Sequence, residues 1–254
     1  MKYYLDTEFH EYEKTTGIFR KAKTPTIDLI SIGIVAEDGR EYYAISKAFD
    51  LNAAWNKWQP KYGSGSDSPR FNIKEYWIRE NVLKPIFDEM VLLSNKAAIN
   101  QNHIIGYGGI VHYPDFTLKN FKKLLKRFGK SREEIADDII KFCWKKVIQE
   151  DPLNIESHPM PIQFYAYYAD YDWVVFCWLF GRMIDLPEGF PMYCIDLKQI
   201  FDEKTIKLSL KNDGDHMDLK AHTHYPTQEN EHNALDDAKW NKRLHYFILS
   251  IDEK

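Results

Sequence analysis

Apolar and polar residues alternate at the start of the chain, over the segment KYYLDTEF (2–9). This period of two predicts a β-strand in which Asp6 and Glu8 share one face. Side chains two residues apart in a strand lie about 6.5 to 7 Å apart and point the same way, so the two carboxylates repel each other unless a positive charge lies between them. The strand therefore raises the question of what supplies that charge.

The pattern continues into a hairpin and then into a loop-rich segment. Two β-rich runs in TIDLISIGIVAEDGREYYAIS flank Asp38 and Gly39, a pair that favours a tight turn because both residues tolerate positive φ. Three antiparallel strands are therefore expected to open the fold. After them the sequence predicts an exposed loop in WQPKYGSGSDSPRFN (58–72), a helix from about Ile73 to Leu93, and an irregular glycine-rich stretch over 100–114 with room for a short strand.

The second half of the chain alternates helical and strand patterns. Leucine and phenylalanine recur at helical spacing from Thr117 to Gly129, and Ser131 with Glu134 forms a capping box for a second helix. Further on, the pattern predicts a strand in IQFYAYYA (162–169), a buried helix in WVVFCWLFGRM (173–183), a strand in FPMYCIDL (190–197) and an amphipathic helix in NALDDAKWNKRLHYFIL (233–249). This order predicts an α/β fold, a mixed sheet of three antiparallel strands followed by parallel strands, with helices on both faces.

Composition and charge limit the classes of function. The chain has 254 residues, 44% of them hydrophobic, and is expected to form a single domain over 1–254 with insertions near 53–130 and 211–231. Its net charge of −4 gives no general attraction to polyanions. There is no basic segment followed by an apolar one at the start and no run of about 18 apolar residues, so no membrane association is expected, and the expected location is cytoplasmic.

Carboxylates recur in two further apolar contexts. Asp170 and Asp172 lie where the strand IQFYAYYA gives way to the next helix, and His232, Asp236 and Asp237 lie at the start of the last helix. Carboxylates that are brought together have raised pKa values, and the usual way to keep them ionised is to bind divalent cations. Oxygen ligands favour Mg²⁺ or Mn²⁺, and two such ions stabilise both the attacking and the leaving oxygen of a phosphoryl displacement while a histidine deprotonates the water. We therefore expect a metal between the first two carboxylates and a phosphodiester as substrate.

Three segments carry a resemblance to a known family. DTEF, YDWVVFCW and HNALDDA resemble the three exonuclease motifs of the DEDDh 3′→5′ exonucleases, also called the DnaQ-like family, within the ribonuclease-H-like superfamily. The resemblance implies a ribonuclease-H-like sheet, His232 as the general base, and two Mg²⁺ or Mn²⁺ ions held by Asp6, Glu8, Asp172 and Asp237.

Within that family, the sequence is similar to the polyadenylate-specific exoribonuclease AS family. The similarity rests on DTEF, on the hairpin LISIGIVAEDGREYYAIS and on YDWVVFCWLFG. It implies a 3′→5′ exoribonuclease that releases nucleoside 5′-monophosphates from single-stranded RNA, with a preference for adenylate and a homodimeric assembly. The commoner opening D-x-E-T-T-G is absent, because Phe9 and His10 follow Glu8, so the contacts of the T-G step to a terminal nucleotide are not carried over.

Several of these residues also have a structural interpretation. Asp170 and Asp172 can each cap a helix, and because the resemblance aligns Asp172 with the metal ligand, Asp170 is the expected capping or supporting residue. With Asn233 as N-cap, Asp236 falls at the third helical position, where a carboxylate favours the helix dipole. Residues five apart on a helix diverge by about 140°, so His232 must lie before the helix to reach the metals.

Other polar and aromatic residues have less specific patterns. Asp196 is expected to cap the short helix that follows it. The acid-free basic run from Lys119 to Arg132 fits either a solvated helix face or a surface that contacts phosphates. Phe9 and Trp173 are candidates for stacking on the terminal base, worth about 1 to 3 kcal/mol, and otherwise belong to the core. No compact zinc pattern is formed by the irregularly spaced His216, His222, His224 and His232.

Two alternative functions stay open from the sequence. Nothing in the motifs reads the 2′-hydroxyl, so a DNA 3′→5′ exonuclease of proofreading or repair type is the first alternative. The second is a catalytically inactive nucleic-acid-binding protein of the same fold, which we would expect to lack at least one of the four acids or the histidine.

Overall fold

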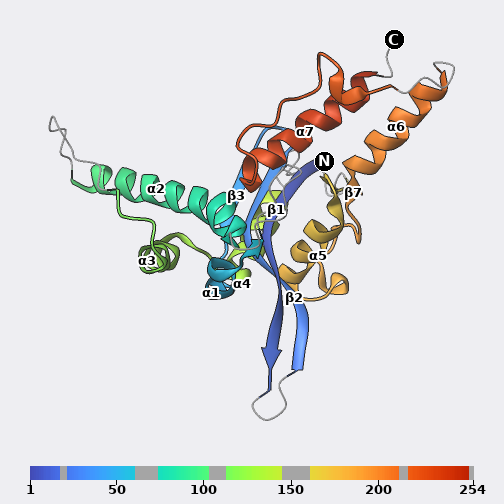
Figure 1. Ribbon diagram of the computed structural model, residues 1–254. Coiled ribbons are helices and arrows are strands. Elements are labelled where there is room, and N and C mark those ends of the chain that lie inside the picture. Colours follow the sequence, from blue (N-terminus) through green and yellow to red (C-terminus); the bar gives the residue numbers. More distant parts are fainter. Residues whose placement is uncertain (18–21, 61–73, 103–112, 145–160, 212–216, 252–254) are drawn as a thin grey trace, which may run out of the picture. The chain divides into compact units, whose positions relative to one another are not determined.

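The computed structural model describes residues 1–17, 22–60, 74–102, 113–144, 161–211 and 217–251 (Figure 1). The chain divides into two compact units. The first consists of Met1–Phe9, Leu29–Ser46 and Ser131–Lys254, and the second of His10–Asp28 and Lys47–Lys130. The insertion expected near 53–130 lies within the second unit.

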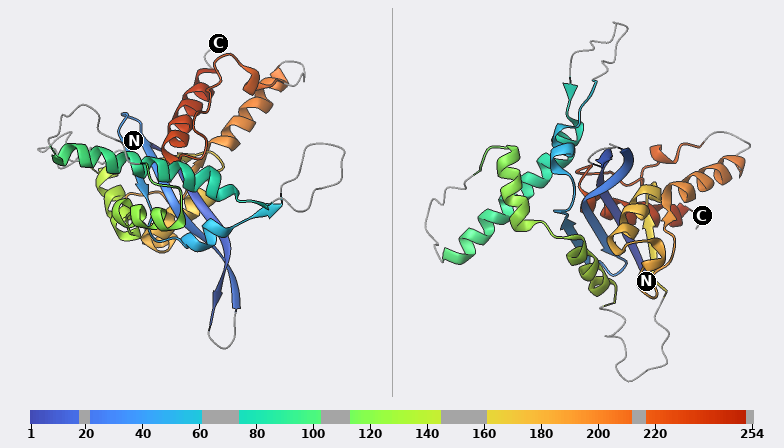
Figure 2. Two further views of the ribbon diagram at one scale, coloured as in Figure 1. Left: turned by 60° about the vertical axis from the view of Figure 1, so that its left-hand side comes forward. Right: turned by 90° about the horizontal axis from the view of Figure 1, so that it is seen from below.

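A five-stranded mixed sheet is the main sheet of the chain (Figure 2). Its spatial order is β3-β2-β1-β6-β7, with bounds β1 Lys2–Thr16, β2 Ala22–Ala36, β3 Glu41–Ile45, β6 Gln163–Ala166 and β7 Ile195–Asp196. β3 pairs antiparallel with β2, whereas β6 pairs parallel with β1 and β7 pairs parallel with β6. Gly39, with a φ of 91°, lies in the turn between β2 and β3. The α/β fold with a ribonuclease-H-like mixed sheet is therefore confirmed.

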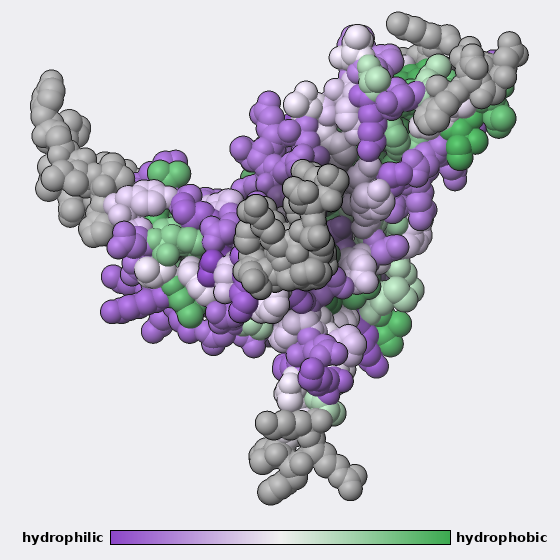
Figure 3. Space-filling model, in the orientation of Figure 1, coloured by the Kyte–Doolittle hydropathy of each residue, from purple (hydrophilic) through white to green (hydrophobic). Residues whose placement is uncertain are grey.

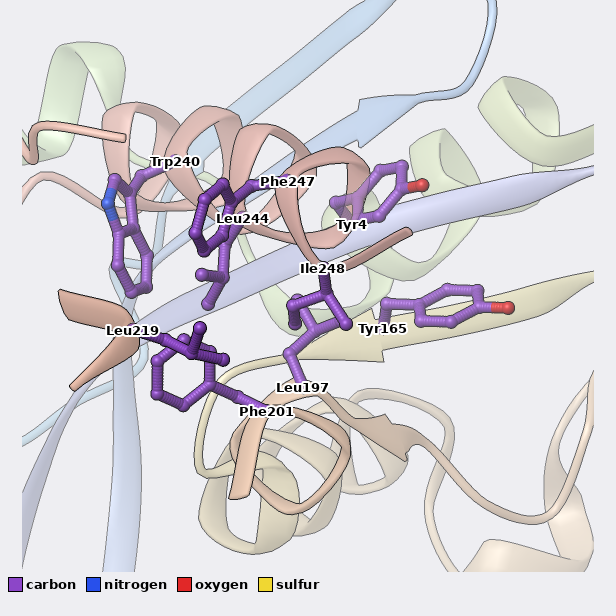
Figure 4. Packing of buried hydrophobic residues seen from close by; sticks show 9 residues of the cluster. All are labelled: Tyr4, Tyr165, Leu197, Phe201, Leu219, Trp240, Leu244, Phe247 and Ile248. Carbon is purple, nitrogen blue, oxygen red and sulfur yellow. The ribbon is translucent and has the colours of Figure 1, made fainter. Parts of the chain in front are cut away.

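One face of the sheet packs against α6 (Leu197–Lys211) and α7 (Ala234–Ser250). Tyr4 of β1 and Tyr165 of β6 point to this side, where they join side chains of both helices in one buried cluster (Figure 4). The Tyr4 hydroxyl also makes a buried hydrogen bond of 2.8 Å with His245 Nδ1. Burying each large apolar side chain of such a cluster contributes about 1.5 to 3 kcal/mol, so the two helices are held firmly on the sheet.

The opposite face packs against α4 (Arg132–Trp144) and α5 (Ala169–Phe180). Tyr3 and Phe164, the neighbours of the two tyrosines, point to this side because successive strand residues alternate between faces. The Tyr3 ring contacts Phe142 of α4, and the Phe164 ring contacts Phe176 of α5. The prediction of helices on both faces is therefore correct.

Gly33 on β2 allows the start of α7 to approach the sheet closely. A Cβ atom at Gly33 would lie 2.2 Å from the Ala234 carbonyl oxygen and 2.4 Å from Leu235 Cα, closer than any side chain tolerates. The helix begins there because Asn233 is its N-cap and accepts hydrogen bonds from the amides of Leu235 and Asp236. The predicted N-cap is confirmed, and the N-terminal end of α7 packs closely against β2.

The start of α5 differs from the prediction. The apolar pattern placed the helix from Trp173, whereas α5 begins at Ala169. The N-cap Tyr168 has a φ of 58°, a left-handed conformation that ends the strand earlier than predicted, and the Ala169 amide donates to the Asp196 carboxylate at 3.3 Å. Asp172 therefore lies inside the first turn of a helix. Asp196 also accepts from the Lys198 amide at 2.7 Å, so it caps α6 as expected.

The second unit is mostly helical. Its elements are α1 Leu51–Asn56, β4 Gln59–Pro60, β5 Lys74–Glu75, the π-helical turn η1 Arg79–Leu83, α2 Lys84–Asn102 and α3 Leu118–Phe128. The helix predicted from about Ile73 thus starts at Arg79 and continues to Asn102, while α3 ends before Gly129 as predicted. The short strand considered over 100–114 falls largely on residues outside the described part of the chain.

The remaining elements are short. Two 3₁₀ turns, η2 Met183–Asp185 and η3 Leu219–Ala221, lie in the first unit.

The capping box predicted before α4 is present, because the Ser131 amide donates to Glu134 Oε2 at 2.6 Å and the Glu134 amide donates to Ser131 Oγ at 3.2 Å. Among the described residues, no helix combines the length and apolar character needed to cross a membrane.

Candidate active site

Asp6 and Glu8 lie on β1 just past the stretch that pairs with β6. That pairing runs from Lys2 to Tyr4, and β6 ends at Ala166. The face of β1 that carries Tyr4 also carries both carboxylates, as the period of two predicts. Ligand sites in α/β sheets form at the carboxyl ends of parallel strands, which is the position of these side chains relative to β6.

Asp172 is joined to β1 through Thr7. The Thr7 amide donates to Asp172 Oδ1 at 2.8 Å, and the Thr7 hydroxyl donates to the same oxygen at 2.6 Å. Hydrogen bonds to an ionised acceptor are about twice as strong as neutral ones. The middle residue of the DTE segment therefore holds the buried carboxylate of α5 next to the two acids of β1.

Asp237 is brought to the same place by α7. Asn241, one turn further along the helix, donates from Nδ2 to the Leu5 carbonyl at 2.9 Å in a buried hydrogen bond. Residues four apart on a helix share a face, so this bond places Asp237 on the side of α7 that meets β1 beside Asp6. Asp237 is itself buried.

The segment before α7 completes the surroundings of Asp237. Gln228 donates from Nε2 to Asp237 Oδ1 at 2.7 Å, and the His232 amide donates to Asp237 Oδ2 at 2.9 Å. His232 has a φ of 71°, a left-handed conformation that few residues other than glycine adopt. It lies before the helix, as the divergence of residues five apart required.

These residues line one cavity of about 380 Å³. The lining contains the four carboxylates with His232, the supporting Thr7, Gln228 and Asn241, and the aromatic residues Phe9, Tyr167, Tyr168, Tyr171 and Trp240. No lysine or arginine lines it within the described ranges. A cavity of this size and composition can bind a small polar ligand that also carries an aromatic group.

Burial raises the pKa values of all four carboxyl groups, and repulsion from other acids of the cluster adds to the rise for Asp6 and Glu8. Burial, followed by the charges of Asp172, Glu8 and Asp237, holds the pKa of Asp6 well above its ordinary value. Burial with the charges of Asp237 and Asp172 raises the pKa of Glu8 to about 8. Burial raises the pKa of Asp172 to about 7 against its hydrogen bonds from Thr7, and the pKa of Asp237 is also raised by burial. Without a cation the cluster therefore retains protons at neutral pH.

Three of the carboxylates lie close enough together to share a cation. Asp6, Glu8 and Asp237 each offer an oxygen, and these atoms all lie within 4.8 Å of one another. Asp172 lies outside this trio, but its charge has the largest effect of the three neighbouring acids on the pKa of Asp6. An all-oxygen donor set suits hard cations such as Mg²⁺ or Mn²⁺. The arrangement can bind a divalent cation and present it to a ligand in the cavity.

The two aromatic candidates have different positions. Phe9 lines the cavity and stacks on Tyr171, with ring centroids 5.8 Å apart. Trp173 does not line it: its side chain is buried and stacks on Phe176 at 4.9 Å. The exposed aromatic ring beside Phe9 is thus that of Tyr171, which precedes Trp173 by two residues.

Sequence reasoning missed the residues that support the acids. Thr7 stands inside the DTE segment, but nothing in the sequence pairs it with Asp172. Gln228 lies in a polar loop with no periodic pattern. Tyr171 directly precedes Asp172, and its place on the exposed side of α5 became clear only from the earlier start of that helix.

The other polar residues singled out in the sequence lie outside the acid cluster. Asp170 is exposed and does not cap α5, because the helix begins before it at Ala169. Asp236 lies in the first turn of α7 as expected and accepts from Asn230 Nδ2 at 3.1 Å. His222 and His224 contact each other, and neither belongs to a group of three potential metal ligands within the described residues, whereas His216 lies outside them.

Comparisons with known proteins point in the same direction as the geometry. Residues 121–249 match the family described as the 3'-5' exoribonuclease Rv2179c-like domain, a range that contains Asp172, His232 and Asp237. The chain is 26% identical over 253 residues to the 3'-5' exoribonuclease Rv2179c of Mycobacterium tuberculosis strain H37Rv, covering 100% of this chain and 96% of the relative. The 3'-5' exoribonuclease of M. tuberculosis strain CDC 1551 matches with the same identity and coverage. The chain belongs to the 3'-5' exoribonuclease Rv2179c-like domain family.

Proposed function

We propose that this chain is a metal-dependent 3′→5′ exoribonuclease of the DEDDh type that releases nucleoside 5′-monophosphates from the 3′ ends of single-stranded RNA. The observation that carries the proposal is the trio of Asp6, Glu8 and Asp237, whose oxygens lie within 4.8 Å of one another in the cavity that His232 also lines. The family match and the names of both relatives support the direction of cleavage and the choice of RNA.

The four acids would hold two Mg²⁺ or Mn²⁺ ions. Bound there, the ions supply an activated water and offset the negative charge on the leaving oxygen of the phosphodiester. Asp172 suits this role because both Thr7 hydrogen bonds go to Oδ1, which leaves Oδ2 for a ligand. The raised pKa values of Asp6 and Glu8 also fit, since a cation between them replaces the protons that they otherwise retain.

His232 would accept the proton of the attacking water. Its amide hydrogen bond to Asp237 Oδ2, 2.9 Å long, keeps the residue beside the acid cluster. A general base of this kind contributes about 10²- to 10⁴-fold to the rate. Because the amide and not the imidazole makes this bond, removing the imidazole leaves the contact to Asp237 in place.

Phe9 and Tyr171 would stack on the base at the 3′ end. Their rings are 5.8 Å apart, and Tyr171 is 54% exposed, so a base has room to lie against it. Stacking of this kind contributes about 1 to 3 kcal/mol and is tolerant of sequence. It therefore does not by itself produce the adenylate preference, which remains a prediction from the family resemblance.

Hydrolysis of 5′-labelled oligonucleotides tests the proposal. Single-stranded RNA, including oligoadenylate, is incubated with Mg²⁺ or Mn²⁺ beside DNA of the same sequence. We expect stepwise shortening of the RNA from its 3′ end, which EDTA stops. Faster shortening of the DNA would favour the DNA exonuclease, and no shortening of either polymer by folded, metal-bound protein would favour the inactive binding protein.

A matched pair of variants tests the role of His232 as the general base. His232→Ala should lose about 10²- to 10⁴-fold in kcat and still bind Mn²⁺. Asp170→Asn, which changes an exposed carboxylate near Asp172, should keep its activity. Full activity in His232→Ala would remove the histidine from the mechanism.

The homodimer and the cytoplasmic location also remain predictions. Sedimentation equilibrium of the purified protein tests the homodimer.

A further inference from the structure

The helix α3 in the second unit carries a cationic stripe. Its basic side chains recur at intervals of three and four residues, all of them exposed: Lys119, Lys122, Lys123, Lys126 and Arg127. At 3.6 residues per turn they fall within an arc of about 140° and extend over about 12 Å of the helix. Figure 3 shows hydrophilic residues next to hydrophobic ones over this part of the second unit.

The other side of α3 fixes the direction of the stripe. Phe121, Leu124 and Leu125 are buried, and the Phe121 ring contacts Phe87 of α2 and Trp55 of α1. Packing against these rings holds the apolar face inside the second unit. The cationic stripe therefore faces solvent.

No carboxylate neutralises the stripe within the described residues. The segment from Phe116 to Arg132 contains no aspartate or glutamate. Lys122 Nζ donates to Asn52 Oδ1 at 2.9 Å and Arg127 donates to Ser94 Oγ at 3.0 Å, both uncharged acceptors. On α6, by contrast, lysines pair with acids one turn away. Like charges three or four residues apart destabilise a helix, so an unneutralised stripe on a chain with a net charge of −4 calls for an anionic partner.

A groove runs beside the stripe, between α3 and α2. It has a volume of about 230 Å³. Its lining combines the buried Val91 and Leu124, the amide side chains of Asn95 and Asn120, and the cationic Lys123 and Arg127. An apolar surface with amide groups at one side and cations at the other suits a nucleoside attached to a phosphate better than it suits a flexible acidic side chain.

We propose that the stripe and groove of α3 bind the sugar-phosphate backbone of single-stranded RNA. Phosphates repeat along a strand at regular intervals, and cations that repeat along a helix can contact several of them at once. The need for a polyanion follows from the charge of α3, and the choice of RNA as that polyanion rests on the proposed function. These contacts read no sequence, because they go to phosphates.

Fluorescence anisotropy tests the proposal with a labelled single-stranded RNA of about 20 nucleotides, longer than most single-strand sites. The measurements are made in EDTA, where no metal-dependent hydrolysis occurs and the acid cluster does not attract phosphates. The test variant removes three stripe charges through Lys119→Gln, Lys123→Gln and Lys126→Gln. The control removes three exposed charges of the first unit through Lys141→Gln, Lys207→Gln and Lys220→Gln.

We expect the stripe variant to bind RNA about tenfold more weakly at low salt, and the control to change by less than about twofold. The dependence of log Kd on log salt should flatten by about 0.7 for each lost phosphate contact, so by about 2 for the stripe variant. Glutamine keeps the helix propensity of lysine, and circular dichroism checks the fold. If the triple variant does not fold, each single substitution should still flatten the dependence by about 0.7.

Three results would overturn the proposal: unchanged affinity and salt dependence in the stripe variant, equal losses in stripe variant and control, or tighter binding of labelled polyglutamate than of RNA. Because no turnover is measured, these outcomes are independent of the proposed exonuclease activity. An inactive enzyme whose stripe binds RNA, and an active enzyme whose stripe does not, are thereby distinguished.

Discussion

Replacing Asp6 by asparagine should stabilise the divalent-free protein while it removes hydrolysis. The amide has the shape of the carboxyl group, so the substitution leaves no cavity. In the unfolded chain an aspartate ionises near pH 3.9, whereas burial and the neighbouring acids hold the pKa of Asp6 well above that value in the folded chain. Retaining the proton costs the folded state up to about 1.4 kcal/mol for each pH unit above 3.9. An asparagine side chain at this position does not titrate and would carry no such cost.

The distances give an independent magnitude. Oxygens of Asp6, Glu8 and Asp237 lie within 4.8 Å of one another, and two full charges at that distance repel by about 3.5 kcal/mol at an effective dielectric constant of about 20. Part of the repulsion is relieved near neutral pH, because the pKa of Glu8 is raised to about 8. We therefore expect Asp6→Asn to raise the free energy of unfolding by about 1 to 3 kcal/mol near pH 8, and by much less near pH 5.

Urea unfolding in EDTA, followed by tryptophan fluorescence, measures the effect. Asp170→Asn is the control, an exposed carboxylate of the same fold whose replacement should change the stability by no more than about 0.5 kcal/mol. Mn²⁺ at about 100 times its Kd should stabilise the parent by about 2.7 kcal/mol and the Asp6→Asn variant by less. A variant that is less stable than the parent near pH 8 without divalent cations would refute the idea that these acids repel one another in the folded chain.

Three further predictions follow from the same contacts. In EDTA the contribution of Asp172 and Glu8 to the stability of the parent should be largest below about pH 4 and be lost as the pH rises toward about 8, because the pKa values of these groups rise on folding to about 7 and about 8. Increasing stability between about pH 5 and about pH 8 in urea unfolding would contradict the sign. Thr7→Val removes the 2.6 Å hydrogen bond from the Thr7 hydroxyl to Asp172. The substitution should lower the free energy of unfolding by about 1 to 3 kcal/mol and the affinity for Mn²⁺ by about tenfold. An unchanged Kd for Mn²⁺ in calorimetry would exclude a supporting role of Thr7. Gly33→Ala would place a Cβ atom 2.2 Å from the Ala234 carbonyl oxygen and should lower the free energy of unfolding by about 3 kcal/mol or more. A decrease of less than about 1 kcal/mol in urea unfolding would mean that α7 shifts easily.

The parts of the fold that the sequence predicted well depend on information held within a short segment. The period of two places Asp6 and Glu8 on one face of β1 whatever the rest of the chain does. The caps at Asn233 and Ser131 are likewise local, because each side chain bonds to amides within three residues. Local rules of this kind predicted the strands of the five-stranded sheet, the end of α3, the start of α7 and the position of His232 before it.

What the sequence did not predict depends on contacts between distant segments. Thr7 and Asp172 are 165 residues apart in the chain, so no periodicity relates them. The start of α5 at Ala169 depends on the Asp196 carboxylate, which lies 27 residues further on and accepts from the first amide of the helix. With the helix assumed to start at Trp173, the exposed position of Tyr171 could not be anticipated.

The hydrogen bonds of the site divide its four acids into two kinds. Asp172 accepts two bonds from Thr7, and Asp237 accepts bonds on both of its oxygens, so these hydrogen bonds offset part of the rise in pKa that burial causes in these two groups. Within the described residues, Asp6 and Glu8 accept none, and burial with neighbouring negative charge only raises their pKa values. The two acids on helices thus accept hydrogen bonds, whereas under the proposed function the pair on β1 would be stabilised by the cation itself. Among the described residues no lysine or arginine lines the cavity to supply the positive charge that the alternating strand requires, so binding a divalent cation there should release more protons from Asp6 and Glu8 than from the other two acids.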